Sequence, residues 1–420
     1  MAPACPVTSV AGLVHAHASP SPIGFTLEPC DEPIHAQPAR PCHRTTALNA
    51  RRGQCNLAHW CSGAAFAGQG QPALRATFQG DPRYNDQLPN FLSAEFREQS
   101  LRFTRDWLQK IEAVGAEGLS GQDLLSYQIF VRDARNEIEG SHFPDWMQPI
   151  NQFYNIASTV VQLGSGTGAQ PFKTVQDYDN WQRRASRFPV LFDQAIANMR
   201  EGIEAGVVQP RDLMEKVVPQ LDALIKPKAE DTLFWGPIPK LPDSFSAADK
   251  QRITNDYRQL IEGELLPAYR ELRQFIVDDY LPHTRTSAGM AALPNGEAWY
   301  AYKARDSTST DLSPAQIHQI GLNEVARIHG LMRGVMKELG YQGTLQDFFK
   351  FMQNDPRFIF KSEEELLVFY RGLESKVNAR VGEQFSLIPK AAFEIRAVEP
   401  FRAKSASGGS YMRPSEDGTR

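Results

Sequence analysis

The sequence predicts a mainly α-helical fold, with one large multi-helix domain and a small β element. From about residue 71 onward, apolar residues recur at spacings of three, four and seven, which is the period of an amphipathic helix. Several of these stretches open with Ser or Thr followed three residues later by Asp, Glu or Gln, which is the signature of a helix capping box. In the C-terminal part, residues 393–399 (FEIRAVE) read as a short strand.

Composition excludes several function classes. The chain has 420 residues, of which 41% are hydrophobic, so it can bury a large core. Its formal net charge of −4 provides no basic footprint for nucleic acid or for an anionic membrane. No apolar run approaches the roughly 20 residues that cross a bilayer. We therefore expect no nucleic-acid partner and no transmembrane segment.

Residues 1–70 differ from the rest and are predicted to be a separate leader. All five cysteines lie within the first 61 residues, and the leader shows neither helical nor alternating apolar periodicity. Cys42, Cys55 and Cys61 lack the close ligand pairs of a structural zinc site. The apolar run at 7–14 is short, and no basic residue precedes it, as one would in a secretion signal. We interpret 1–70 as a disordered or misassigned leader.

The domain at 71–420 begins with two predicted helices. Ser93 starts the first, and Ser120 with Asp123 resembles a capping box for the second. Their predicted buried stripes are Phe96, Phe103, Trp107, Ile111 and Val114, then Leu124, Tyr127, Val131, Ala134 and Ile138. The following segment, 142–170, contains helix-breaking prolines and glycines with many aromatics and amides. It is either a partly buried loop packed on the helices or one wall of a cleft.

The most regular predicted helix starts at Thr174 and Asp177 and ends near Gly206. Its apolar stripe alternates spacings of three and four: Tyr178, Trp181, Ala185, Phe188, Phe192, Ala195 and Met199. Pro189 is expected to kink it, because proline removes a backbone hydrogen bond and crowds the preceding turn. An aromatic stripe at this spacing indicates core.

Further helices are predicted downstream. One follows Pro210, and a long one runs from Ser246 towards Tyr280 with Pro267 inside it. Capping signatures at Thr344 with Asp347, and at Ser362 with Glu365, start two more amphipathic helices.

Residues 293–329 carry the strongest functional signal. Trp299 and Tyr300 are predicted on an aromatic strand, which leads into a turn rich in hydroxyl groups that includes Thr308 and Thr310. Ser313 then caps a helix, with Pro314 in its first turn and Gln316 completing the box. A strand edge beside a polar helix start is suited to an extended ligand.

The predicted helix after Ser313 contains polar residues that are candidates for a binding site. Its predicted inward stripe is Ile317, Gly321, Glu324, Ile328, Leu331, Val335 and Leu339. Glu324 thus falls in an apolar row, where an unpaired charge would cost several kcal/mol. It either pairs with a cation such as Arg327 or serves a site. His318 lies near the hydroxyl turn, but His318 and His329 are eleven residues apart, too distant to share one ion.

Sequence motifs for other chemistries are missing from the chain. It has no Gly-x-Ser-x-Gly elbow, no phosphate-binding loop and no dinucleotide fingerprint after a strand. The spacing from Glu324 to His329 does not match the His-Glu-x-x-His geometry of a zinc helix. We therefore assign no catalytic residue and no metal ligand in this chain.

Several blocks resemble the bacterial family known as domain of unknown function 885. They are GDPRYND (80–86), FPDWMQPINQF (143–153), PFKTVQDYDNWQRR (171–184), MREGIEAGVVQPRDL (199–213), GEAWYAYKARDSTSTDLSPAQIHQIGLNEVARIH (296–329) and YMRPSEDGTR (411–420). The resemblance spans about residues 71–420 and implies the helical shell of a gluzincin-type zinc hydrolase that acts on peptides or small amides.

The same resemblance implies what the chain lacks. Such families hold zinc with a His-Glu-x-x-x-Gly-His type helix and a later Glu, expected after the segment that ends at Arg420. No position here matches those ligands, so we expect a domain that is incomplete at its C-terminus. The residues expected to line the substrate cleft are Trp299, Tyr300, Thr308, Thr310, His318 and Glu324, with Tyr411 and Arg413 on the approach to the zinc site.

Two functional hypotheses follow. The first is an inactive, incomplete part of a zinc-dependent hydrolase, for which zinc is the implied cofactor of a complete member. The alternative is a non-catalytic helical binding or scaffold protein that uses the same cleft.

Overall fold

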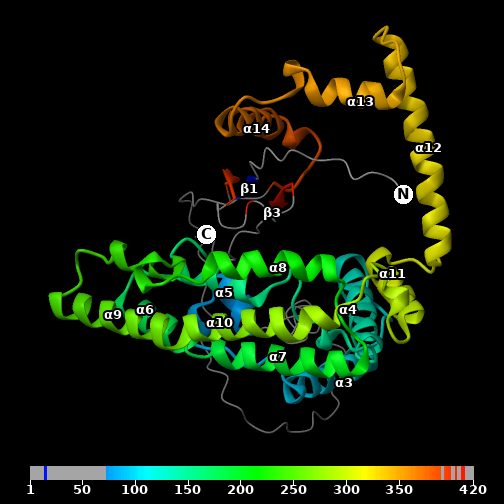
Figure 1. The fold of residues 1–420 in the computed structure, drawn as a ribbon. Helices are drawn as coiled ribbons and strands as arrows, with labels where there is room; N and C mark the ends of the chain where they lie inside the picture. The colour runs from blue at the N-terminus through cyan, green and yellow to red at the C-terminus, as the bar shows by residue number, and fades with distance from the viewer. Residues whose placement is uncertain (1–13, 17–71, 389–391, 399–402, 404–407, 412–420) are drawn as a thin grey trace.

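The computed structural model describes residues 14–16, 72–388, 392–398, 403 and 408–411. The fold is mainly helical, as predicted (Figure 1). The predicted leader, apart from residues 14–16, lies outside the described residues.

Residues 72–308 form a helical body. Its helices are α2 (Pro72–Gln79), α3 (Ala94–Val114), α4 (Gly121–Gly140), α5 (Ile156–Gly164), α6 (Val175–Ala185), α7 (Phe188–Ala205), α8 (Arg211–Leu224), α9 (Ala247–Leu260), α10 (Leu266–Phe275) and α11 (Gly296–Thr308). α10 packs against both α7 and α8, while α3 pairs with α4 at one end of the body (Figure 1). Short 3-10 turns join them at Pro82–Tyr84, Asp145–Met147, Ala229–Asp231, Leu233–Trp235, Ile238–Lys240, Leu281–His283 and Met290–Ala292.

The core of the body is built on the predicted aromatic stripe. Trp181 is 1% exposed, Phe188 is fully buried, and the other stripe residues are buried with them. The predicted single kinked helix is wrong, however, because α6 ends at Ala185 and α7 begins at Phe188. Pro189 lies in the first turn of α7, where its missing N–H would have had no helical partner in any case. The Thr174–Asp177 capping box and the left-handed stop at Gly206 are confirmed.

The long helix that starts at Ser246 is confirmed, with two wider turns inside it. π-helical turns at Ile261–Leu265 and Ile276–Tyr280 flank α10. Pro267 follows the first of them directly, in the opening turn of α10. A local π-turn shifts the hydrogen-bond register, so a proline can be accommodated without ending the helix.

The predicted caps and buried stripes of α3 and α4 are confirmed only in part. Ser93 caps α3 through its side chain, whereas Ser120 makes no side-chain cap hydrogen bond. Of the two predicted stripes, the fully buried members are Ile111, Val131 and Ala134. The two helices pair with each other at the end of the body, so much of their surface faces solvent.

Two local predictions are wrong. Residues 156–164, expected to be loop, form α5, whose N-cap Asn155 accepts a hydrogen bond from the Ala157 N–H. The apolar run there is long enough for two buried turns. The aromatic strand predicted at Trp299 and Tyr300 is instead part of α11, which also includes Thr308 of the predicted turn. In a helix Trp299 and Tyr302 share one face, and both are buried on it.

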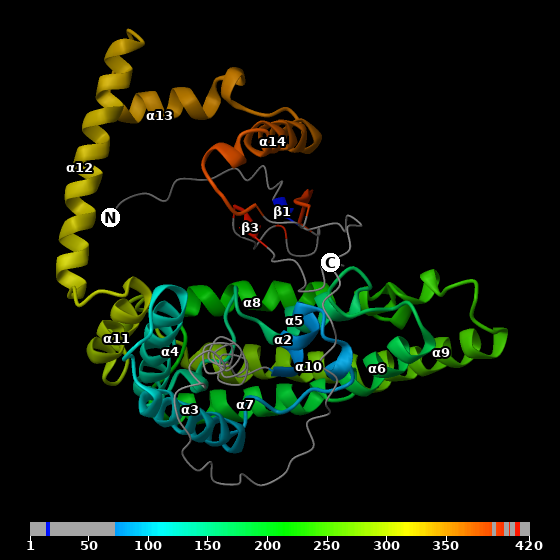
Figure 2. The ribbon, with the colours of Figure 1, turned by 180° about the vertical axis from the view of Figure 1, so that it is seen from behind.

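Residues 313–388, here called the arm, leave the body after α11. The arm contains α12 (Pro314–Glu338), α13 (Leu345–Asn354) and α14 (Glu363–Asn378), with 3-10 turns at Pro356–Phe358 and Val381–Glu383. Figures 1 and 2 show α12 extending away from the body, with α13 and α14 beyond α8. The side-chain caps at Ser313, Thr344 and Ser362 are confirmed.

The apolar stripe of α12 was predicted to face the core, and this prediction is wrong because most of the stripe is exposed. Met336 is the one buried residue of α12, and the stripe residues Ile328, Leu331, Val335 and Leu339 are exposed. The periodicity is correct, but the described residues supply no layer that covers it.

The predicted strand at 393–399 is confirmed as β2 (Ile395–Ala397). β1 (Val14–Ala16) lies between β2 and β3 (Ser410–Tyr411), antiparallel to β2 and parallel to β3. Across the part of the chain that is described, no helix has both the length and the apolar character needed to span a membrane.

The tight contact between α5 and α6 yields a test of the core. A Cβ added at Gly164 would lie 2.3 Å from the Trp181 ring and 2.8 Å from Phe234. Gly164→Ala should therefore lower the free energy of unfolding by about 1–3 kcal/mol in urea titrations, through overpacking. Gly263→Ala, where a Cβ meets nothing within 4 Å, is the control and should be neutral or stabilising. Equal effects of the two variants would contradict this packing.

Candidate functional site

The junction between α11 and α12 fixes a turn that exposes hydroxyl groups. Ser309 ends α11 in the left-handed conformation, with φ 55°. Its Oγ accepts a hydrogen bond of 2.7 Å from the Arg132 guanidinium on α4. The hydroxyls of Thr308 and Thr310 are 2.9 Å apart, and both side chains are exposed. The turn is thus held to the body while its hydroxyls face outward.

The two aromatic residues predicted for the site, Trp299 and Tyr300, both lie on α11, but one is buried and the other is exposed. Trp299 is 2% exposed and stacks on Phe143, with ring centroids 6.0 Å apart and planes at 7°. Its indole N–H has no hydrogen-bond partner among the described residues. Tyr300 is 49% exposed. Trp299 therefore anchors α11 to the body, and Tyr300 is the one available to a ligand.

His318 and Glu324 lie on the arm and are both exposed. Glu324 forms an ion pair of 2.8 Å with Arg327, one turn further along the helix. This is the pairing that the sequence offered as one alternative, but at the surface and not in an apolar interior. An exposed pair of this kind contributes about 0–1 kcal/mol, so Glu324 is free to serve a ligand.

The last two predicted residues lie at the C-terminal end. Tyr411 is on β3, 64% exposed, and stacks on Phe393 with ring centroids 6.4 Å apart. Arg413 lies outside the described residues. Of the predicted residues that are described, Thr308 and Thr310 are the pair that the structure brings into direct contact.

The described residues do not fit a zinc site. A structural or catalytic zinc needs at least three side chains of the His, Cys, Asp or Glu type converging on one point. No such group of three forms within residues 14–16, 72–388, 392–398, 403 and 408–411. No catalytic step can therefore be derived through a metal on these side chains.

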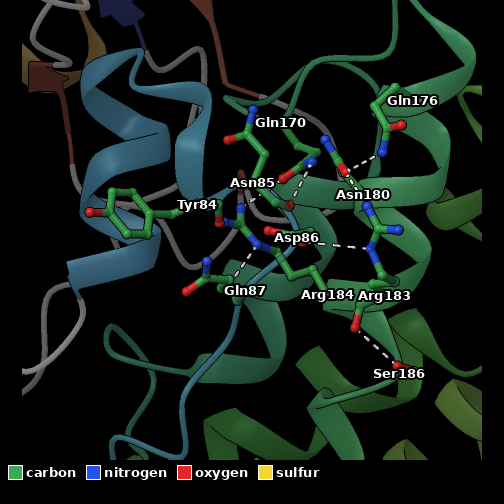
Figure 3. Close-up of polar contacts among 10 residues, drawn as sticks. All are labelled: Tyr84, Asn85, Asp86, Gln87, Gln170, Gln176, Asn180, Arg183, Arg184 and Ser186. Carbon is green, nitrogen blue, oxygen red and sulfur yellow. Dashed lines mark hydrogen bonds and ion pairs between the residues drawn. The ribbon is translucent and has the colours of Figure 1, made fainter. Parts of the chain in front are cut away.

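A polar cluster that the sequence analysis missed surrounds Arg184 on α6 (Figure 3). This guanidinium is fully buried, and its N–H groups donate to the Gln87 carbonyl at 3.0 Å and to Gln170 Oε1 at 2.7 Å. It also donates to the carbonyls of Tyr84 and Ala73. One side chain thus ties the segment before α3 to the core.

Arg184 has no direct carboxylate partner among these contacts. Burial lowers its pKa to about 10, while the nearby Asp86 opposes that shift. Asp86 itself pairs with Arg183 at 3.6 Å. Because the N–H groups of Arg184 go to backbone and amide oxygens, the cluster acts as a clamp and not as a catalytic group. Tyr84, Asp86, Arg183 and Arg184 fall in the blocks 80–86 and 171–184, and Gln87 and Gln170 directly adjoin them. These blocks are the sequence signal that points to the cluster.

A pocket of about 390 Å³ opens beside this clamp. It is lined by Ala73, Tyr84, Asp86, Gln87, Leu88, Pro89 and Arg187. Its walls mix apolar groups with one acid and one base, which suits a small polar molecule but specifies no reaction.

Comparison with known proteins identifies the family. The model of a bacterial protein family of unknown function, DUF885, matches residues 74–420. The chain belongs to this family. No curated protein matches it. A solved structure, described as the putative lipoprotein from Colwellia psychrerythraea, has a similar fold with a TM-score of 0.75 and 22% sequence identity.

That similarity covers 87% of this chain and 66% of the Colwellia chain. At this identity it shows the fold alone. The match therefore spans just under two thirds of the length of the Colwellia chain.

The clamp predicts a large stability effect at one of two adjacent arginines. Arg184→Met leaves Gln170 and several carbonyls without their donor, so it should lower the free energy of unfolding by about 3 kcal/mol. Arg183→Met removes an exposed ion pair with Asp86 and an exposed hydrogen bond to Asn180, and should cost about 1 kcal/mol or less. Urea unfolding followed by circular dichroism measures both. If the two variants lower the free energy of unfolding equally, Arg184 is not the residue that holds the clamp.

Proposed function

We propose that this chain supplies one wall of the substrate site of a zinc-dependent hydrolase that acts on peptides or related amides. In this proposal, the catalytic metal is carried by polypeptide that packs against the arm. The proposal is supported by the DUF885 membership of residues 74–420 and by the peptidase-like resemblance of the blocks at 80–86, 143–153, 171–184 and 296–329.

One observation carries the proposal. At 100° per residue, the apolar residues of α12 form a band that spans roughly 200° of the helix surface. His318 and Glu324 fall inside this band. Seven of its ten apolar residues are exposed, namely Ile320, Leu322, Val325, Ile328, Leu331, Val335 and Leu339, whereas Ile317 and Met332 are partly buried and Met336 is buried. A layer placed over α12 would therefore enclose both polar side chains at an interface, which is where binding residues are found.

The exposed turn adds hydrogen-bonding groups beside that interface. The Thr308 hydroxyl donates to the Ala304 carbonyl and contacts the Thr310 hydroxyl, so it orders the turn. Thr310 and Tyr300 present exposed hydroxyl oxygens that can accept a hydrogen bond from an amide substrate. His318 follows the turn in the first part of α12. These residues would bind and orient a substrate, and none is assigned to the reaction itself.

The alternative is a non-catalytic binding or scaffold protein. Both hypotheses accept that the described residues bring no three metal-binding side chains together. The DNA that follows codon 420 separates the two hypotheses. A His-Glu zinc helix encoded there, in frame or shifted, supports the hydrolase. A natural stop followed by unrelated sequence supports the scaffold.

Metal analysis of the purified chain tests the proposal. We expect no stoichiometric zinc by elemental analysis after dialysis, and no hydrolysis of mixed peptide substrates with added zinc. Both follow because the ligands are proposed to lie on other polypeptide. One tightly held zinc per chain, or zinc-dependent hydrolysis by this chain alone, would refute it.

A further inference from the structure

We infer that the pocket beside the Arg184 clamp is a binding site for a small monocarboxylate with an apolar body. This cavity, called here the Arg187 pocket, lies between the segment 84–89, the first turn of α2 and the junction of α6 with α7. It is separate from the proposed substrate site. α7 has 18 residues, about 27 Å of helix; it begins at the pocket and ends beside Val207, which packs in one cluster with Trp299. The inference therefore does not depend on the proposed function.

Arg187 provides the group that would bind the carboxylate. Its backbone is fixed at the junction of α6 and α7, where its N–H donates to the Arg184 carbonyl at 3.1 Å. Its guanidinium is exposed and has no hydrogen bond, ion pair or ring contact with any residue that the structure describes. A planar guanidinium can donate two parallel hydrogen bonds to one carboxylate, which matches its geometry better than it matches other anions of single charge.

The charges around the pocket favour an anion. Asp86 is the one acid in the lining, and its Oδ2 pairs with Arg183 at 3.6 Å. Buried Arg184, close to Asp86 in Figure 3, donates its hydrogen bonds to carbonyl and amide oxygens, not to a carboxylate. The charge of Asp86 is thus balanced by Arg183, while Arg184 and Arg187 leave an excess of positive charge. Such an excess attracts a carboxylate and repels an ammonium group.

The wall opposite Arg187 is held rigidly. Arg184 donates to the carbonyls of Tyr84 and Gln87, at either end of the segment that carries Asp86. Between them, the Asn85 side chain is buried and accepts a hydrogen bond of 2.8 Å from the Thr77 hydroxyl on α2. Because these bonds exist before any ligand arrives, binding requires little further ordering of the pocket.

The remaining lining suits an apolar body. Leu88 is 8% exposed and Ala73 is 3% exposed, and Pro89 and the Tyr84 side chain complete the apolar part of the wall. The cavity volume of about 390 Å³ lies near the lower end of the range for small-molecule sites, roughly 300–1,000 Å³. A short branched acid fits these features, with its carboxylate at Arg187 and its alkyl group against Leu88. A second carboxylate would be repelled by Asp86.

Isothermal titration calorimetry of the whole chain tests the ligand class. The probes are isocaproate, its uncharged amide isocaproamide, and L-leucine, which adds an ammonium group to the same skeleton. At neutral pH and low ionic strength, we expect saturable one-to-one binding of isocaproate. Isocaproamide should bind at least about tenfold more weakly, because a charge-assisted hydrogen bond is lost. L-Leucine should also bind more weakly, because its ammonium group meets the excess positive charge.

A variant at Arg187 tests the position of the carboxylate. Arg187→Met should bind isocaproate and isocaproamide equally, since the group that distinguishes them is gone. Its urea unfolding midpoint should not change, because the side chain is exposed and has no partner among the described residues. Arg102→Met is the matched control, because Arg102 is an exposed arginine on α3 outside the pocket lining. This control should keep the tenfold preference for isocaproate.

The other outcomes overturn the inference. If isocaproate does not bind saturably, or binds no better than isocaproamide, the pocket is not a carboxylate site. If Arg187→Met keeps the preference for isocaproate, the carboxylate lies elsewhere. If L-leucine binds as tightly as isocaproate or more tightly, Asp86 accepts the ammonium group and the ligand class is a zwitterion. None of these measurements involves zinc or hydrolysis, so the proposed function can fail separately.

Discussion

The burial of apolar surface on α12 is the constraint on which this account depends. Each exposed leucine or isoleucine of the band would gain about 1.5–3 kcal/mol on full burial. A helix with this pattern on half of its surface is therefore under strong pressure to acquire cover on two sides. The body does not provide that cover, and the exposed residues of α8, the body helix on the side of the arm, are mainly charged (Figures 1 and 2). The arm therefore exposes apolar surface that the described residues do not cover.

The body, by contrast, is held by its own interactions. Trp181, Phe188 and Tyr269 lie at the centre of the aromatic core, where Tyr269 also donates a hydrogen bond of 2.5 Å to the Ala157 carbonyl. Arg184 fastens the segment before α3 onto this core, and Trp299 fastens α11 to Phe143. Because α11 is fixed, the start of α12 and the hydroxyl turn before it are fixed as well. The body therefore fixes the position of the hydroxyl turn and of the start of α12, most of whose side chains are exposed.

Local sequence signals predicted the helices well. Capping at Thr174, Ser313 and Thr344 follows from side chains within three residues, so no tertiary knowledge is needed. The stripe from Tyr178 to Met199 identified the core, although the break before Phe188 was placed as a kink. The predicted strand at Trp299 and Tyr300 is wrong: adjacent aromatics favour a strand, but Trp299 and Tyr302 are buried together on one face, as a helix allows.

The candidate site was less predictable because it depends on neighbours distant in sequence. Glu324 was correctly given Arg327 as one partner, yet its apolar row was expected to be covered. No local pattern points to Arg184, since its partners lie about 14 to 110 residues away and are mainly backbone carbonyls. Periodicity reveals which face of a helix is apolar. It does not reveal what covers that face.

Amide hydrogen exchange of the isolated chain tests the central claim most directly. If α12 has no covering layer, its amides should exchange orders of magnitude faster than those of α7, because a lone helix opens readily in water. The account predicts this difference at all protein concentrations. Protection of α12 equal to that of α7 in the isolated chain would show that its apolar band is already buried, and would contradict the account.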